Sequence, residues 1–254
     1  LWSKKNLAPF NSQIKIYKDK FFVIDFDNIL RAYSINNGKE IWNIKTEKSL
    51  TRSLKKLSMV IVDEKIYFNN SMGDISSVDI NSGELIWQTP TQSNQVFDHS
   101  YFLKASDIIT DKKALYFSNN KNEFYSLDAQ TGSLIWKQEI DSDLRPTIIG
   151  DYLLTVSSGG YLIILEKKSG NIIRVNDIFN TIKPKKRSIV KPVGFIVGLD
   201  NIYLTTNQGK LLVIDIATGK TKSTIKVDNK KISRPMVVNQ NLFIITDNSI
   251  IRLN

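Results

Sequence analysis

The 254-residue sequence contains no cysteine and a single histidine, His99. The absence of cysteine excludes disulfide bonds, thiolate metal sites and thiol nucleophiles from this chain. One histidine cannot form a multi-histidine metal site. No apolar run reaches the roughly 20 residues of a membrane-spanning helix. The sequence begins at Leu1, with neither an initiator methionine nor the basic and apolar regions of an export signal, so we expect a processed or trimmed product.

Acidic residues are fewer than basic ones, and the formal net charge is +10. One interpretation is binding to an acidic partner, a membrane surface or nucleic acid. The other is a general enrichment in Lys, Asn and Ile, which is typical of an AT-rich genome. The densest basic segment is the loop 183–191. No nucleic-acid recognition motif accompanies it, so we do not predict nucleic-acid binding.

The sequence is organised by an internal repeat. Five segments share an Asp-like residue, three turn residues, a glycine, three further residues and a tryptophan or its replacement. The glycines of these segments are Gly38, Gly83, Gly132, Gly170 and Gly219, and they lie 38 to 49 residues apart. That period is typical of one four-stranded blade of a β-propeller.

Each repeat predicts strands joined by tight turns. Triplets such as Asn36-Asn37-Gly38 indicate hairpins, because glycine supplies the positive φ that such turns require. Apolar residues alternate or form short β-branched blocks, which disfavours helix. In the second and third repeats the predicted strands are 57–61, 65–69, 75–79, 85–89, 106–110, 114–118, 123–127 and 134–138. In the fourth and fifth they include 152–157, 161–166, 201–206 and 210–215.

The two ends of the chain fit the same scheme. Residues 234–238, 241–246 and 250–254 predict three strands, and residues 1–4 predict the missing fourth, because closing the ring removes exposed sheet edges. We therefore expect an all-β protein: one β-propeller domain over 1–254 with six four-stranded antiparallel blades, the N-terminal strand completing the last. A fragment of an eight-bladed ring would have the same pattern.

At the Asp-x-x-x-Gly-x-x-x-Trp spacing the sequence resembles the PQQ-like, or tryptophan-docking, repeat. In that family the tryptophan packs on the glycine turn of an adjacent blade. The residues that carry the resemblance are Gly38, Trp42, Gly83, Trp87, Gly132 and Trp136, with Trp2 in the same slot at the N-terminus. Ser34 and Glu166 replace the Asp, and Arg174 and Ser223 replace the Trp, so we expect looser docking in the later repeats.

The resemblance implies one of two main functions. Quinoprotein dehydrogenases of this family hold a quinone beside a vicinal disulfide and a calcium ion. Because cysteine is absent and the chain is short for such an enzyme, we predict no cofactor, no metal and no enzymatic activity. BamB-type lipoproteins share the repeat without the quinone, and they dock on periplasmic domains of the barrel-inserting subunit of the outer-membrane β-barrel assembly machinery.

The resemblance to BamB-type proteins thus implies a non-enzymatic protein-binding scaffold in the periplasm. Such proteins are normally eight-bladed and are attached to the outer membrane through a lipidated N-terminal cysteine, which would precede this sequence. An extracellular or periplasmic sensor propeller that binds a small ligand remains an alternative. A central pocket lined by convergent polar groups would favour that alternative.

Three connections between blades supply the candidate partner site, because loops that join an outer strand to the next inner strand share one face. They are 47–53, 89–104 and 141–146, and the last resembles the acidic, proline-terminated link of BamB-type proteins. The candidate residues are Leu50, Arg52, Asp98, His99, Tyr101, Asp141 and Asp143. Aromatic and charged side chains together suit an interface. Alternatively, the aromatic residues fold inward, the aspartates cap turns and the histidine is solvated.

Overall fold

The computed structural model describes residues 2–47, 52–53, 55–91, 102–119 and 122–253. The chain divides into two compact units, Leu1–Gln138 and Glu139–Asn254. The regular secondary structure of the described part is almost entirely β-strand, with a four-residue helix, α1 (Pro184–Arg187). None of its helical residues form a span long and apolar enough to cross a bilayer.

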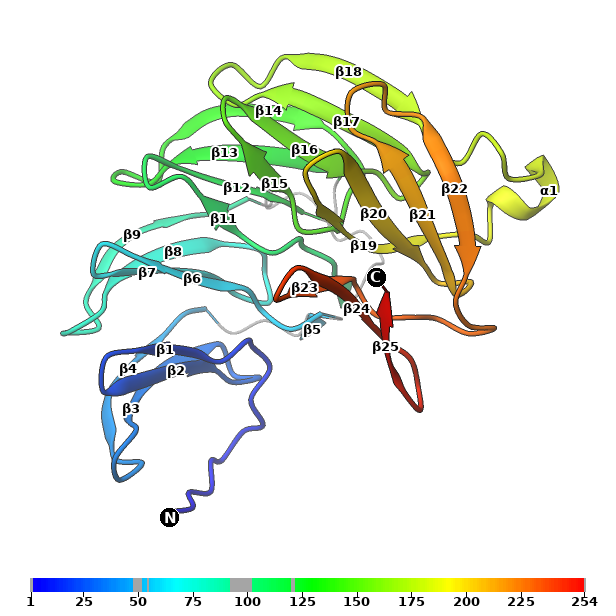
Figure 1. Cartoon of the computed structure of the whole chain (residues 1–254). Helices are drawn as coiled ribbons and strands as arrows, with labels where there is room; N and C mark the ends of the chain where they lie inside the picture. Colours follow the sequence, from blue (N-terminus) through cyan, green and yellow to red (C-terminus); the bar gives the residue numbers. More distant parts are fainter. Residues whose placement is uncertain (1, 48–51, 54, 92–101, 120–121, 254) are drawn as a thin grey trace. The chain divides into compact units, whose positions relative to one another are not determined.

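The first unit contains three four-stranded sheets, each with its strands side by side in chain order (Figure 1). We call each of these antiparallel meanders a blade. The first blade is β1 (Lys15–Tyr17), β2 (Lys20–Ile24), β3 (Ile29–Ser34) and β4 (Glu40–Lys45). The second is β6 (Met59–Val62), β7 (Lys65–Asn69), β8 (Ile75–Asp79) and β9 (Leu85–Thr89). The third is β11 (Ile109–Thr110), β12 (Ala114–Ser118), β13 (Glu123–Asp128) and β14 (Leu134–Glu139).

The second unit continues the pattern with two four-stranded blades and a three-stranded sheet. The fourth blade is β15 (Thr147–Ile149), β16 (Tyr152–Val156), β17 (Tyr161–Glu166) and β18 (Ile172–Asp177). The fifth is β19 (Pro192–Val197), β20 (Asn201–Thr206), β21 (Lys210–Asp215) and β22 (Thr221–Lys226). The last sheet is β23 (Met236–Val238), β24 (Asn241–Ile245) and β25 (Ile250–Leu253). Helix α1 lies in the connection between β18 and β19 (Figure 1).

The predicted strands are confirmed where alternation and turns are clear: β7, β8, β9, β12, β17, β20 and β21 have the expected bounds. Two expectations need correction. The basic loop 183–191 begins with helix α1, whose first residue, Pro184, has the fixed φ that suits a helix start. Residues 2–9 belong to no strand, so the expected fourth strand of the last sheet is not formed by the described residues.

A repeated irregularity shapes the last hairpin of the blades. In the first, second, fourth and fifth blades, the ladder between the third and fourth strands shifts register at the same place, one or two residues before the Asp-like position. In the second blade Asp79 then closes the turn, because its Oδ1 accepts hydrogen bonds from the backbone N–H groups of Asn81 and Ser82 at 2.8 Å each. The carboxylate thereby organises the turn that presents Gly83.

The core of each unit lies between neighbouring blades. In the first unit, Phe22 and Leu30 of the first blade pack with Ile66 and Phe68 of the second. A second cluster joins the second blade to the third. In the second unit, one cluster joins the fourth and fifth blades and another joins the fifth blade to the last sheet. Within each unit, neighbouring blades are therefore held together by burial of apolar side chains.

The tryptophans lie on the glycine turns in the way that the resemblance implies. Trp42 donates its Nε1 hydrogen to the carbonyl of Ile80 at 3.2 Å, and a Cβ placed on Gly83 would lie 2.6 Å from an indole carbon. Trp87 packs in the same way on the turn of Gly132. Trp2 does so on the turn of Gly38, although it lies outside any strand.

Candidate functional site

The turns between the second and third strands of the blades contact the connections that link successive blades. In the first blade, Asn28 is buried and donates from Nδ2 to the carbonyl of Glu47 at 2.9 Å and to Ser71 Oγ at 2.7 Å. Ser71 returns a hydrogen bond from its backbone N–H to Asn28 Oδ1 at 3.1 Å. Asn28 thus fixes the start of the first connection and ties it to the turn of the second blade.

The second connection is held in the same manner. Thr91, which is buried, donates from Oγ1 to the carbonyl of Gly73 at 2.7 Å. Its own carbonyl accepts hydrogen bonds from Asn119 Nδ2 at 3.3 Å and from the Tyr125 hydroxyl at 3.1 Å. The second and third blades together therefore position the start of this connection.

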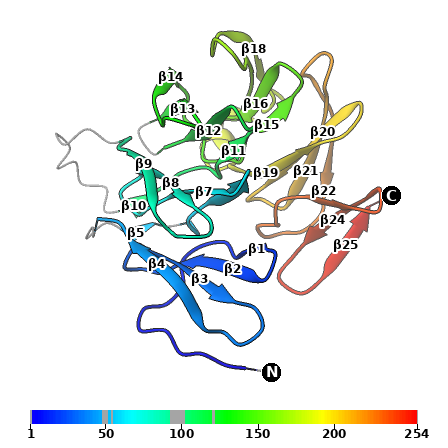
Figure 2. The same cartoon turned by 90° about the vertical axis from the view of Figure 1, so that its left-hand side faces the viewer.

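The two connections then pair with each other. Arg52 and Ser53 form β5 (Arg52–Ser53), which runs parallel to β10 (Phe102–Leu103) (Figure 2). This pairing was missed from the sequence, because two-residue strands carry no periodic signal. It brings the loops 47–53 and 89–104 together, as expected for connections that share one face.

The candidate residues of these two loops are placed only in part. Of Arg52 the structure describes the backbone, which lies in β5. Leu50, Asp98, His99 and Tyr101 lie outside the described residues. Their contribution to a binding surface stays a prediction.

In the third connection, the exposed carboxylate of Asp141 accepts a hydrogen bond from Ser158 Oγ at 3.0 Å, and the Asp141 carbonyl accepts one from the Ser158 backbone N–H at 2.8 Å. This contact joins Asp141 to a residue 17 positions along the chain, so it differs from the turn cap to its own downstream backbone that was the alternative for the aspartates. Ser142, between them, is buried and donates to the carbonyl of Val156 at 2.8 Å.

Asp143 is half-buried and also has a polar or electrostatic contact. The third connection is therefore held from within by Ser142. It belongs to the second unit, so a single patch made from all three connections remains a prediction.

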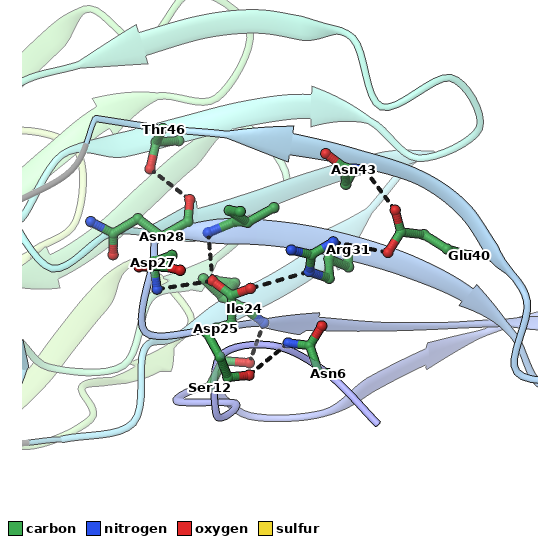
Figure 3. Close-up of polar contacts among 12 residues, drawn as sticks. Asn6, Ser12, Ile24, Asp25, Asp27, Asn28, Arg31, Glu40, Asn43 and Thr46 are labelled. Atoms are coloured by element: carbon green, nitrogen blue, oxygen red, sulfur yellow. Dashed lines mark hydrogen bonds and ion pairs between the residues drawn. The ribbon is translucent and has the colours of Figure 1, made fainter. Parts of the chain in front are cut away.

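A buried polar network, also missed from the sequence, supports the first of these turns (Figure 3). The side chain of Asp25 is fully buried, and its Oδ1 accepts hydrogen bonds from the backbone N–H groups of Asp27 and Ile29 at 3.0 Å each. Its Oδ2 accepts from Arg31 Nε at 3.1 Å, and Arg31 Nη1 reaches Glu40 Oε2 at 2.9 Å. The closely spaced Asp25 and Asn28 between two apolar segments are the signal that could have revealed it.

The network sets one guanidinium between two carboxylates. Burial alone would raise the pKa of Glu40, but hydrogen bonds from Asn43 and Arg31 outweigh it and hold the pKa below its ordinary value. Burial opposes the charge of Arg31 as well, yet Glu40 and Asp25 raise its pKa. Internal partners thus favour the charged forms of Arg31 and Glu40, which suits a structural support.

Comparison with known proteins decides the family. The family model described as "Outer membrane protein assembly factor BamB" matches residues 1–176. The chain belongs to this family. No curated protein matches the sequence.

Two solved structures share the fold. BamB from Moraxella catarrhalis is 15% identical with a TM-score of 0.82, over 99% of this chain and 74% of that one. Quinohemoprotein alcohol dehydrogenase from Comamonas testosteroni is 12% identical with a TM-score of 0.68, over 86% of this chain and 43% of that one. The expected β-propeller of PQQ-like repeats is confirmed.

Within this BamB-type propeller, polar side chains hold the connections between blades. The polar side chains described above are committed to backbone carbonyls, backbone N–H groups or one another. They hold the ends of the connections, and the connections carry the exposed carboxylate of Asp141. Loops held by a rigid scaffold are the usual place for recognition.

Proposed function

We propose that this chain is a non-enzymatic protein-binding scaffold of the outer-membrane β-barrel assembly machinery. The observation that carries the proposal is the pairing of two connections through β5 and β10. The starts of these connections are held by hydrogen bonds of Asn28 and Thr91. Membership in the family described as an outer-membrane protein assembly factor supplies the biological setting. The partner is a periplasmic protein, namely the barrel-inserting subunit.

The paired connections suit this role because their ends are ordered before a partner arrives. A preorganised surface loses less conformational entropy on binding than a free loop does. Tyr101 serves as the aromatic anchor, and Leu50 contributes a second apolar side chain. The charged residues Arg52 and Asp98, together with His99, set the orientation and the association rate.

The acidic connection extends the binding surface. Asp141 keeps an exposed carboxylate while bonded to Ser158, and it is suited to a basic group of the partner. Asp143 contributes a second carboxylate two residues away. The protein works in the periplasm and is associated with the outer membrane.

The binding site is tested by titrating the soluble periplasmic domains of the barrel-inserting subunit with wild-type protein and with Tyr101→Ala/Arg52→Glu. The affinity should fall by about tenfold or more while the melting temperature is unchanged, because an interface anchor is lost without a core contact. A control pair is Tyr152→Ala/Lys39→Glu. It removes an exposed tyrosine from strand β16 and an exposed lysine from the docking turn of Gly38. Equal affinities for the wild type and the Tyr101/Arg52 variant would move the site elsewhere.

The absence of catalysis needs its own assay, because a quinohemoprotein dehydrogenase shares the fold. The protein should show no dye reduction with alcohols or sugars after incubation with quinone and calcium. Turnover above the level of a heat-denatured sample would refute the proposed scaffold.

A further inference from the structure

The second unit contains a groove that the proposed function does not use. It has a volume of about 510 Å³ and lies between the segment around α1 and the outer strands of the fifth blade. The residues that line it are Thr181, Ile182, Lys183, Lys186, Lys210, Leu212, Thr221, Lys222, Ser223 and Thr224. The lining thus carries four lysines and four hydroxyl groups and no carboxylate.

Most of this positive charge is uncompensated. Lys222 forms an ion pair with Asp215, its Nζ lying 2.7 Å from Oδ2. For Lys183, Lys186 and Lys210, no carboxylate of the described chain lies within ion-pair distance. Three ammonium groups that share one groove repel each other, and an anionic ligand would relieve that repulsion.

The strand register adds to the charge. Lys210 of β21 lies directly opposite Lys226 of β22, and like charges in that position destabilise a sheet. Lys226 directs its ammonium group to the carbonyl of Gln208 at 2.9 Å, which satisfies a hydrogen bond without neutralising the charge. The fifth blade therefore maintains lysines along its outer strands at a cost in stability.

The groove also lies where the repeat departs from its pattern. Ser223 of β22 takes the place of the docking tryptophan, and it lines the groove with an exposed, small, hydroxyl-bearing side chain. Helix α1 supplies Lys186 from the opposite wall, three residues after Lys183. Two departures from the repeat, the helix insertion and the missing tryptophan, thus meet in one basic groove.

We propose that this groove binds an acidic segment of a protein partner in an extended conformation. Both walls carry lysines, Lys183 and Lys186 on one and Lys210 and Lys222 on the other, which suits several carboxylates in succession better than one compact anion. Thr221, Ser223 and Thr224 offer hydroxyls to the backbone of such a segment. Ile182 and Leu212 add apolar surface to the lining of the groove.

This site is separate from the proposed partner face, since neither Asp141 nor Asp143 lines the groove. The two proposals can therefore fail independently. Loss of binding at one set of residues leaves the other set to be measured in the same protein.

The test is a fluorescence anisotropy titration of the full chain with a fluorescein-labelled, glutamate-rich peptide. Lys183→Glu/Lys186→Glu should weaken binding by about tenfold or more, since each change replaces an attraction with a repulsion. Lys5→Glu/Lys39→Glu, at two exposed lysines outside the groove, has the same net charge and should stay within about twofold of wild type. Circular dichroism melting shows whether each variant is folded.

Three outcomes would overturn the proposal. The first is that the wild type fails to bind the peptide, and the second is that both double variants lose affinity for it equally. The third is that the groove variant binds the peptide as the wild type does, but alone loses affinity for inorganic phosphate or for phosphatidylglycerol vesicles. If the Lys183/Lys186 variant fails to fold, Ser223→Glu introduces one negative charge in the groove and should weaken peptide binding in the same direction. Unchanged binding in a folded Ser223→Glu protein would also count against the site.

Discussion

The first unit and the second unit solve the same docking problem with different side chains. In the first, Trp42 covers Gly83 with its indole and donates Nε1 to the third carbonyl before that glycine. In the second, Arg174 holds the equivalent place on β18 and donates from Nη2 to the third carbonyl before Gly219 at 2.8 Å. The hydrogen bond to the turn is kept although the tryptophan is not.

The apolar part of the contact is not kept. The side chain next to Gly219 is Asn176, and among the described residues Arg174 Nε and Asn176 Oδ1 are buried without a hydrogen-bond partner. An indole buries a large apolar surface and satisfies its one donor, whereas the guanidinium leaves a polar atom unpaired. The tryptophan repeats should therefore dock more firmly than the arginine repeat.

The largest expected effect is the loss of an indole in the first unit. Trp136 is buried and stacks on Phe124 with ring centroids 5.9 Å apart. Trp136→Ala and Trp87→Ala should each lower the free energy of unfolding by about 3–5 kcal/mol, as for other large aromatic side chains in cores. Urea denaturation measures the loss, with Trp136→Phe as a milder control. A loss below about 1 kcal/mol would contradict the role of these rings as wedges.

The next largest effect separates the two kinds of turn. Gly132 has a φ of +73°, and an added Cβ would lie 2.5 Å from an indole carbon of Trp87. Gly132→Ala should therefore cost about 2–4 kcal/mol, from backbone strain together with overpacking. Gly219 has a φ of +69° but faces the side chain of Asn176, which can rotate away. Gly219→Ala should cost only about 1–2 kcal/mol in the same denaturation assay, and equal costs would contradict the comparison.

A smaller effect is expected at the arginine itself. Arg174→Ala removes two hydrogen bonds to partly exposed carbonyls and should cost about 1 kcal/mol. Arg174→Lys retains the charge but replaces a planar donor pair with a single ammonium group, so it should fall between the wild type and the alanine variant. Chemical denaturation of the three proteins measures the order. If lysine equals wild type, charge alone explains the contact.

The blades could be predicted from sequence because their signals are local. The spacing of Gly83 from Asp79 fixes a turn, and alternation on both sides of it fixes β8 and β9. The repeat then transfers the pattern to blades with weaker signals, such as the fifth. Membership in the family follows from the same motif, and so does the packing of Trp42 and Trp87 on the glycine turns.

The connections and the buried network could not be predicted in this way. Pairing of β5 with β10 depends on two loops that lie far apart in the sequence. The ion pair of Asp25 with Arg31 depends on which side chains are buried. In the sequence, this aspartate and this arginine look the same as a solvated pair on the surface. The candidate partner residues fell on such connections, so the sequence could indicate their loops and leave the surface they form to experiment.

The smallest expected effect is the acid response of the turns. Hydrogen bonds from the backbone N–H of Thr131, with that of Gln130, hold the pKa of Asp128 below its ordinary value despite partial burial. A carboxyl group whose pKa is lower in the folded state stabilises the fold above its unfolded pKa of about 3.9 and loses that contribution as the pH falls through the folded value.

Ser34, which stands where the first repeat lacks the Asp, provides the matched comparison, because its hydroxyl accepts from the Asn36 backbone N–H and does not titrate. Asp128→Asn should reduce the loss of stability between about pH 5 and pH 2, and Ser34→Asp should increase it. Urea midpoints measured across that range, together with those at neutral pH, give the slope for each protein. Parallel pH profiles for all three would mean that the turn carboxylates do not contribute to the acid response of the fold.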